Sequence, residues 1–321
     1  MKSIYQTIAT FDYALVLPLL GKLPLWLNRP LSVCRAIINA IFDLDWRTLS
    51  LGHGYVRSRT FQAMCIVNNL SSPPNRHWAW WMTLQRYICM SREEVDCYRL
   101  NHIDYVSLPH QFKGLEYLLE AQENKIGVVL LHAHFDSLYI GLALLAKAGL
   151  RVNLMSTRIT NDPRVPSAIS KHYSEKRDVL NKLFSPGKVI HVEDSFSFFI
   201  KALKRGEIVV IACDGPATST ERSRPVQFMG GSRLMVAGPQ FLAESTHSLI
   251  ALYTCKETNG SVMEIEITKP TFIEDDGLQK AYSVLETHLL SEPWRWWSSD
   301  MLATYSEVDN AEIKPATSPC L

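Results

Sequence analysis

The clearest hydrophobic pattern in the chain is an apolar run near its middle, followed by a polar turn and an amphipathic stretch. Val128 to Leu131 is aliphatic without a polar interruption, which predicts a strand buried on both faces. Ser137 to Lys147 has the pattern of a helix, and the turn between them carries His132, His134 and Asp136. Because open α/β sheets place their chemistry at the carboxyl ends of strands, this turn is the first candidate site.

Strand and helix patterns alternate through the remainder of the chain. Strands are predicted over 150–155, 189–192, 207–213, 249–255 and 263–267, and helices over 178–184, 194–206 and 238–245. The helix over 194–206 is well marked, because a capping residue precedes it, cations occupy its last turn and Gly206 ends it. The pattern predicts an α/β fold with a mixed central sheet flanked by helices and a helical N-terminal part.

The first 122 residues are predicted to be mainly helical. Ser91 followed by Glu94 matches a capping box and predicts a helix start, while residues 71–75 predict a loop. Three indoles within residues 77–82 are typical of a membrane-interface belt or of a packed aromatic cluster, and packing is favoured. The predicted division is a helical part (1–122), an α/β core (123–306) and a C-terminal tail (307–321).

Residues 13–27 form a strongly apolar stretch that Pro18, Lys22 and Pro24 interrupt. The stretch falls short of the roughly 20 apolar residues that a spanning helix needs, and it lacks the shape of a secretory signal. Two interpretations remain open. The stretch either lies in a membrane interface with cations alongside or forms a core helix of a helical cap.

Composition narrows the classes of function. Lys and Arg total 33 and Asp and Glu 32, giving a net charge of +1, so nucleic acid is not an expected partner. The seven cysteines are scattered, which indicates reduced thiols in a cytoplasmic protein. No third ligand accompanies His132 and His134 at a recognisable spacing, so no metal site is expected. A histidine base acting on a hydroxyl or an amine is the simplest chemistry for the turn.

Six blocks share their order and spacing with one known family: residues 127–139, 156–163, 203–214, 226–230, 238–243 and 292–297. They resemble the bacterial lipid A late acyltransferases, the lauroyl and myristoyl type within the lysophospholipid acyltransferase superfamily. In that family a strand ends in a Gly-His-Phe turn, and His134 and Phe135 take the places of its histidine and aromatic residue. Arg158 takes the place of the arginine in an Arg-Pro-x-x-Asn-Pro segment. Asp214 takes that of the aspartate in an Asp-Gln pair, with Gly215 in place of the glutamine.

The resemblance implies an acyltransferase with His134 as general base. It implies transfer of an acyl group from a thioester to a hydroxyl or amine of a lipid A-like or other lipid acceptor. The donor would be an acyl carrier protein or coenzyme A thioester, with no further cofactor and no metal. The expected location is peripheral on the cytoplasmic face of the inner membrane, or else the cytoplasm.

One position departs from the family pattern. The family has an acidic residue five positions after the histidine, whereas this chain has Tyr139 there. A tyrosine orients an imidazole but stays neutral near pH 7, so it cannot balance an imidazolium. Asp136 is a candidate replacement for the charge, and the alternative is that it caps the following helix. His132 acting as the base with Asp136 four residues later is a further alternative.

The remaining candidate residues are expected to bind substrate. Arg158 is expected to contact a phosphate on the acceptor or on the carrier's prosthetic arm, and a surface ion pair is the alternative. Asp214 has either a direct role or a structural one in its turn. Phe228 and Gly230 are expected to line the substrate cleft or to close the turn beneath it, and His132 is kept as a residue near the substrate.

Two other functions remain open. A specialised carrier-dependent acyl- or aminoacyltransferase for a modified lipid or a secondary metabolite is compatible with the altered acid position. A non-catalytic lipid- or carrier-binding module on the same scaffold is the alternative from another class.

Overall fold

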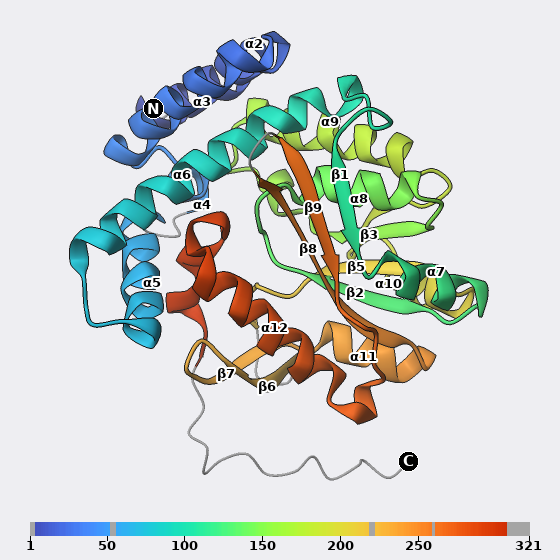
Figure 1. The fold of residues 1–321 in the computed structure, drawn as a ribbon. Helices are drawn as coiled ribbons and strands as arrows, with labels where there is room; N and C mark the ends of the chain where they lie inside the picture. Colours follow the sequence, from blue (N-terminus) through green and yellow to red (C-terminus); the bar gives the residue numbers. More distant parts are fainter. Residues whose placement is uncertain (1–3, 52–55, 218–221, 259–260, 307–321) are drawn as a thin grey trace.

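The computed structural model of the chain describes residues 4–51, 56–217, 222–258 and 261–306 (Figure 1). Its centre is a seven-stranded sheet in the order β1-β9-β8-β2-β5-β3-β4, with a separate β6-β7 hairpin. The strands are β1 (His110–Lys113), β2 (Val128–His132), β3 (Val152–Ser156), β4 (Val189–His191), β5 (Ile208–Ala212), β6 (Ser223–Phe228), β7 (Gly231–Val236), β8 (Leu249–Thr258) and β9 (Val262–Ile267). The predicted tail (307–321) and Cys320 lie outside the described residues.

The sheet is parallel except at one pair of strands, since β8 and β9 are antiparallel. Strand β2 lies between β5 and β8, and both pairings are parallel. Every residue of β2 is buried, which confirms the prediction from its unbroken apolar run. Val129 and Leu131 pack into the hydrophobic core on one face of the sheet, whereas Val128 and Leu130 pack into the core on the other.

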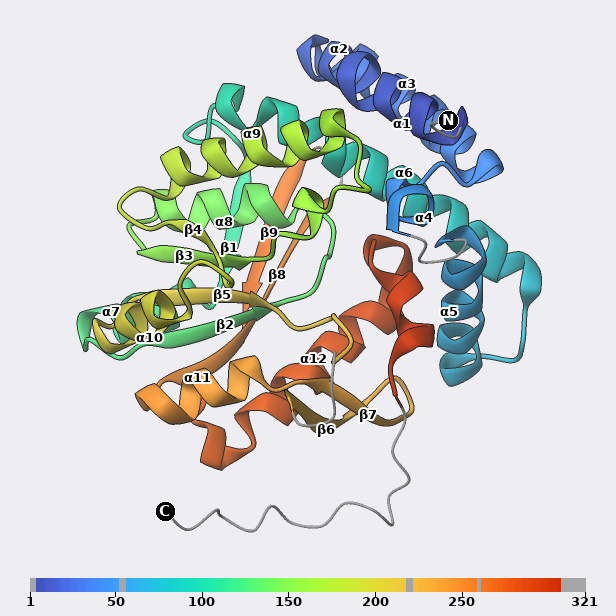
Figure 2. The ribbon, with the colours of Figure 1, turned by 180° about the vertical axis from the view of Figure 1, so that it is seen from behind.

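Helices cover both faces of this sheet. One core includes side chains of α7 (Leu115–Glu123), α8 (Leu138–Lys147) and α9 (Ser167–Phe184). The other includes side chains of α10 (Phe196–Lys204), α11 (Gly238–Thr246) and α12 (Gly277–Ser291). Figure 2 shows these two layers from behind. The architecture is therefore a mixed α/β sandwich with a helical N-terminal region, as the sequence predicts.

The N-terminal helices lie at one end of the molecule, beyond the sheet (Figures 1 and 2). They are α1 (Ile4–Phe11), the π-helical turn η1 (Asp12–Val16), α2 (Leu17–Lys22), α3 (Leu25–Phe42), α4 (Trp46–Leu51), α5 (Val56–Ser71), α6 (Arg76–Arg99) and the 3₁₀ turn η2 (Leu100–His102). Within the described residues, no helix has both the length and the apolar composition needed to cross a bilayer.

One prediction for the N-terminal part is wrong. Ser91 does not start a helix, because Asn75 caps α6 by accepting a hydrogen bond from the backbone N–H of Trp78. The Ser91 hydroxyl instead donates to the carbonyl of Ser32 on α3, 3.0 Å away. Strand β1 interrupts the helical pattern and joins the sheet edge parallel to β9, and α7 then runs from Leu115 to Glu123.

The three tryptophans within residues 77–82 differ in their burial. Trp78 packs against the core, whereas Trp80 and Trp81 are about half exposed. The ring of Trp80 stacks on Phe61 with 4.3 Å between centroids. One indole therefore belongs to the core, and the other two remain on the surface at the start of α6.

Several further elements were not predicted as regular structure. The β6-β7 hairpin pairs antiparallel around the turn that holds Gly230, and α12 packs against β6 and β8. The other 3₁₀ turns are η3 (Ile159–Asn161), η5 (Ile273–Asp275), η6 (Pro293–Arg295) and η7 (Ser299–Thr304). Turns η6 and η7 bring the C-terminal tryptophans behind the ends of β2 and β5.

Candidate active site

His134 and Asp214 meet at the carboxyl ends of two neighbouring strands. Because β2 and β5 are parallel and in register from Val128 opposite Ile208 onward, residues two positions past their ends come together. His134 Nδ1 lies 2.8 Å from Asp214 Oδ1, and the His134 backbone N–H donates to Asp214 Oδ2 at 2.8 Å. The carboxylate that contacts this histidine is therefore Asp214.

Asp214 is fully buried and has several hydrogen-bond donors around it. Trp296 Nε1–H donates to its Oδ2 at 2.8 Å, and the Tyr305 hydroxyl donates to its backbone carbonyl at 2.7 Å. Burial by itself raises the pKa of Asp214, but the positive field and hydrogen bonds of His134 lower that pKa to about 2. The carboxylate is thus ionised at neutral pH and acts only as an acceptor.

This arrangement determines which ring nitrogen of His134 has an available lone pair. An ionised carboxylate can only accept a hydrogen bond, so Nδ1 of His134 carries the hydrogen and Nε2 has the lone pair. The His134 side chain is 34% exposed, and no hydrogen bond to Nε2 is formed by any described residue. The ring of Trp297 meets that of His134 edge to face, with 5.3 Å between centroids. The geometry suits removal of a proton from a group that approaches Nε2.

His132 is a poor second base. Its ring is buried, and its Nδ1 lies 3.1 Å from the carbonyl of Ala133. Burial and the neighbouring His134 lower the pKa of His132 to about 4. The two imidazoles lie 5.7 Å apart, so a neutral His132 forms part of the wall beside His134.

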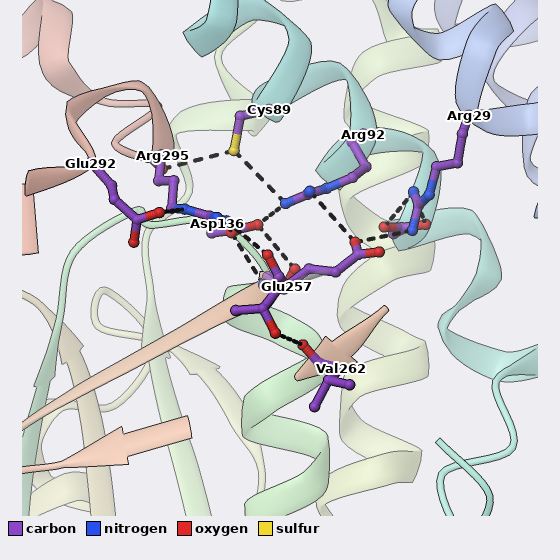
Figure 3. A network of polar contacts seen from close by, with 11 residues as sticks. Arg29, Cys89, Arg92, Asp136, Glu257, Val262, Glu292 and Arg295 are labelled. Carbon is purple, nitrogen blue, oxygen red and sulfur yellow. Dashed lines mark hydrogen bonds and ion pairs between the residues drawn. The ribbon is translucent and has the colours of Figure 1, made fainter. Parts of the chain in front are cut away.

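Asp136 is not the partner of either histidine. Its fully buried carboxylate forms ion pairs with Arg92 on α6 and Arg295 on η6 (Figure 3). It also accepts a hydrogen bond from the backbone N–H of Glu257 at 3.2 Å. The helix-cap alternative fails as well, since Ser137 is the N-cap of α8 and no side chain caps it there.

The arginines around Asp136 extend the ion-pair network to the N-terminal helices. Arg92 also lies 3.5 Å from Glu257 Oε2, and Arg29 on α3 lies 3.3 Å from the same oxygen. Arg29 binds Asp96 through both carboxylate oxygens at 2.9 Å. The carboxylate predicted to act on His134 thus joins the His134 turn to α3 and α6.

The side chain of Trp297 lies between Tyr139 and the imidazole of His134. The ring of Tyr139 packs against Trp297, with 6.3 Å between centroids, and Trp297 in turn contacts His134. The ammonium of Lys176 on α9 lies 4.1 Å from the centre of the Tyr139 ring. Tyr139 therefore supports the wall of the site from behind Trp297.

Arg158 follows β3, two strands away from β2 in the same sheet. It forms an ion pair with Asp194, and its backbone N–H donates to Glu193 Oε1 at 3.2 Å. Its side chain is about half exposed beside an open cavity of about 620 Å³. The ion pair agrees with the interpretation of Arg158 as part of a surface ion pair. The cavity beside it leaves room for the proposed contact with a phosphate.

Phe228 and Gly230 belong to the hairpin turn beneath the site. Phe228 is buried and packs against Trp296, Tyr282 and Tyr305, with ring centroids 5.4–6.4 Å apart. Gly230 has φ = +74°, and a Cβ there would lie 2.4 Å from Leu70 Cδ2. Phe228 is therefore buried in the hairpin next to its turn and supports Trp296.

Residue-by-residue reasoning missed the C-terminal side chains that complete the site. Trp296, Trp297 and Tyr305 all contact His134 or Asp214, directly or through the backbone. The Trp297 N–H also donates to the carbonyl of His134 at 3.0 Å. The tryptophan-rich block at 292–297 was the available signal, because the family resemblance included it.

The fold and the site define an α/β protein with a carboxylate-oriented histidine at the carboxyl edge of its sheet, which is an arrangement for general base chemistry. In the described part of the chain, no three His, Cys, Asp or Glu side chains are grouped to hold a metal ion. A family model described as bacterial lipid A biosynthesis acyltransferase matches residues 79–286, more than half of the chain. The chain belongs to this family and is an acyltransferase, and the family implies a lipid acceptor and an acyl donor. A comparison with curated proteins found no match.

Proposed function

We propose that this chain transfers an acyl group from a thioester on a carrier protein or coenzyme A to a hydroxyl or amine of a lipid A-like acceptor, with His134 as general base. The observation that carries the proposal is the 2.8 Å hydrogen bond between His134 Nδ1 and the buried, ionised Asp214. Asp214 holds the ring in one orientation and one tautomer, and its charge stabilises the imidazolium. Neither Asp136 nor Tyr139 is needed for this function.

The reaction follows from that geometry. Nε2 of His134 removes the proton of the acceptor hydroxyl as its oxygen attacks the thioester carbonyl carbon. The carbon–sulfur bond then breaks, the new ester remains on the acceptor, and the imidazolium returns its proton to the departing thiolate. Trp297 covers one side of the ring and limits access of water. Arg158 binds a phosphate of the acceptor or of the carrier's prosthetic arm when it is released from Asp194.

We further propose that the enzyme lies on the cytoplasmic face of the inner membrane through its N-terminal helices. Ile4, Ile8, Phe11, Leu15 and Leu19 recur at helical spacing from α1 to α2, and all are 38–71% exposed. Trp26, the second residue of α3, is 77% exposed. Tyr13, Leu17 and Leu20 of the same stretch are buried, so residues 13–27 have one face in a core and one exposed apolar face. An exposed apolar stripe of this length is typical of a surface that contacts lipid.

Replacing His134 with Ala tests the catalytic proposal. The purified variant should lose thioester-dependent acylation of a lipid A-like acceptor, measured by release of free thiol and by mass of the product. His132→Gln is the matched control, and it should keep activity within about fivefold because His132 is buried and neutral. Full activity of His134→Ala would exclude His134 as the base.

Assays with different acyl donors distinguish the proposed function from a specialised carrier-dependent acyl- or aminoacyltransferase. If fatty-acyl carrier thioesters give no product while an aminoacyl carrier thioester does, the donor differs from that of the family. If neither donor reacts with a folded protein, the non-catalytic alternative holds.

A further inference from the structure

A second cavity lies between the N-terminal helices and α9. Its volume is about 920 Å³, within the range of sites that enclose a small molecule. The walls come from η1, α2, the end of α6 and α9, not from the strand ends that carry His134 and Asp214. A molecule bound in this cavity therefore occupies a site separate from that of the acceptor at His134.

Aromatic contacts keep the inner wall of this cavity in place. The ring of His172 lies 5.4 Å from Tyr13 and 4.6 Å from Tyr98, and the Tyr98 hydroxyl donates to the carbonyl of Tyr13 at 3.1 Å. Gly21 packs directly on Tyr98, where a Cβ would lie 2.6 Å from the Tyr98 Cβ. Helices α2, α6 and α9 are thus joined around a preformed space.

The rim of the cavity is positively charged. Lys22 is in the last turn of α2 and Arg99 in the last turn of α6, positions at which helices favour cations. Lys171 on α9 lies 3.7 Å from Glu175, the acidic residue of the lining. In the described chain, neither Lys22 nor Arg99 has an acidic partner within 4 Å.

The inner wall contributes no charge to balance this rim. Burial, followed by the positive fields of Lys176 and Arg35, lowers the pKa of His172 to about 3, so its ring is neutral. The Tyr13 and Tyr98 hydroxyls, which also line the cavity, are neutral as well, because burial raises their pKa values. The cavity therefore has a cationic rim and a neutral interior.

The cavity opens beside the exposed apolar stripe of the N-terminal helices. Ala14 and Pro18 line the cavity, and the residues after them, Leu15 and Leu19, are 45% and 53% exposed. Pro24 also lines it, two residues before the exposed Trp26. A molecule in the cavity can thus place apolar chains along the stripe and an anionic group at the rim.

We propose that this cavity binds one anionic phospholipid, with the head-group phosphate between Lys22 and Arg99. The parts of the lipid's acyl chains next to the head group lie against Ala14 and Pro18. The choice of a membrane lipid rests on the membrane attachment proposed above, while the anionic head group follows from the charge of the rim. The bound lipid fixes the position of the N-terminal helices against α9 on the membrane.

Titration calorimetry of the full chain with dihexanoyl phosphatidylglycerol, below its micellar concentration, tests this site. We expect one lipid per chain and at least tenfold weaker binding of dihexanoyl phosphatidylcholine. The double variant Lys22→Gln/Arg99→Gln should raise the Kd at least tenfold, and Arg99→Lys should restore part of the affinity. The matched control Lys147→Gln/Lys204→Gln removes two cations from the last turns of α8 and α10, and its Kd should stay within twofold of wild type.

Four results would overturn the site: unchanged binding by Lys22→Gln/Arg99→Gln, an equal loss in the control, equal affinity for the two lipids, or displacement by an equal concentration of inorganic phosphate. The His134→Ala variant should bind the lipid normally. Normal binding without transfer by the wild type would therefore reject the catalytic proposal alone. Lipid binding in solution without attachment to vesicles would reject only the membrane proposal.

Discussion

Asp214→Asn is the substitution that tests the site most directly. It replaces one carboxylate oxygen with an NH₂ group and leaves the shape of the side chain nearly unchanged. Asp214 Oδ1 binds His134 Nδ1 and Oδ2 binds the His134 and Trp296 N–H groups, each at 2.8 Å. An amide nitrogen in either position faces a donor. If it faces Nδ1, the ring must present its lone pair there, and Nε2 then carries the hydrogen and cannot act as base.

The magnitude follows from the electrostatic coupling in the site. The pKa of Asp214 falls from 3.8 to about 2 although burial opposes the fall, so the ionised carboxylate beside His134 is stabilised by on the order of 2 kcal/mol. Loss of that stabilisation lowers kcat by at least one order of magnitude, and the wrong tautomer extends the loss toward roughly 10⁴-fold. KM should change little, because Asp214 is buried beneath His134 and does not reach the acceptor.

The assay is thiol release from the acyl donor, with the ester product measured by mass. Asp178→Asn is the matched control, since this carboxylate on α9 is 64% exposed and lies 3.9 Å from its nearest cation. It should retain full activity. A folded Asp214→Asn variant that keeps more than about a fifth of the wild-type kcat would refute the role assigned to Asp214.

The same carboxylate affects stability at low pH. Because the folded pKa of Asp214 is below its unfolded value of 3.8, its contribution to stability is present above pH 3.8 and disappears as the pH falls through about 2. Urea unfolding between pH 5 and pH 2 should therefore show a weaker pH dependence for Asp214→Asn than for the wild type. An identical dependence would mean that this carboxylate is not stabilised by folding.

Three further predictions concern the surroundings of the site and the N-terminal helices. Asp136→Ala leaves Arg92 and Arg295 without their buried partner and should lower the free energy of unfolding by about 3–5 kcal/mol in urea titrations; a loss below about 1 kcal/mol would contradict the network. Tyr139→Glu places a carboxylate beside Lys176, so transfer activity should change less than about threefold, and a tenfold gain would show that the family acid position reaches His134. Leu15→Ser/Leu19→Ser should weaken sedimentation with vesicles at least tenfold, whereas the 93% exposed Val106, changed to Ser, should not; equal losses would remove the proposed membrane face.

Much of the fold follows from local sequence patterns. The unbroken apolar run before the histidines predicts β2, and it forms a fully buried strand. The strand ending at Cys213 and the helix ending at Gly206 were predicted for similar reasons, since capping, cations and periodicity are local properties. The capping-box pattern at Ser91 gave a wrong helix start, because a contact with another helix uses this side chain. Ser91 sits inside α6 because its hydroxyl binds α3.

The candidate site was located from the sequence but its partners were not. Both His134 and Asp214 were predicted at strand ends, and the resemblance assigned the base to His134. Sequence distance does not reveal that β5 lies next to β2, which brings together two residues that are 80 positions apart. Asp136 was the nearer carboxylate along the chain. Arg92 and Arg295, from α6 and η6, bind it instead.

The sequence by itself determined the α/β class, the strand that ends at the histidines and the family to which the blocks belong. Only the tertiary structure decided which carboxylate faces His134, which tryptophans cover it, and that Lys22 and Arg99 share one cavity. The physical reason is that burial and periodicity act over a few residues, whereas ion pairs and hydrogen bonds depend on strand order and helix packing.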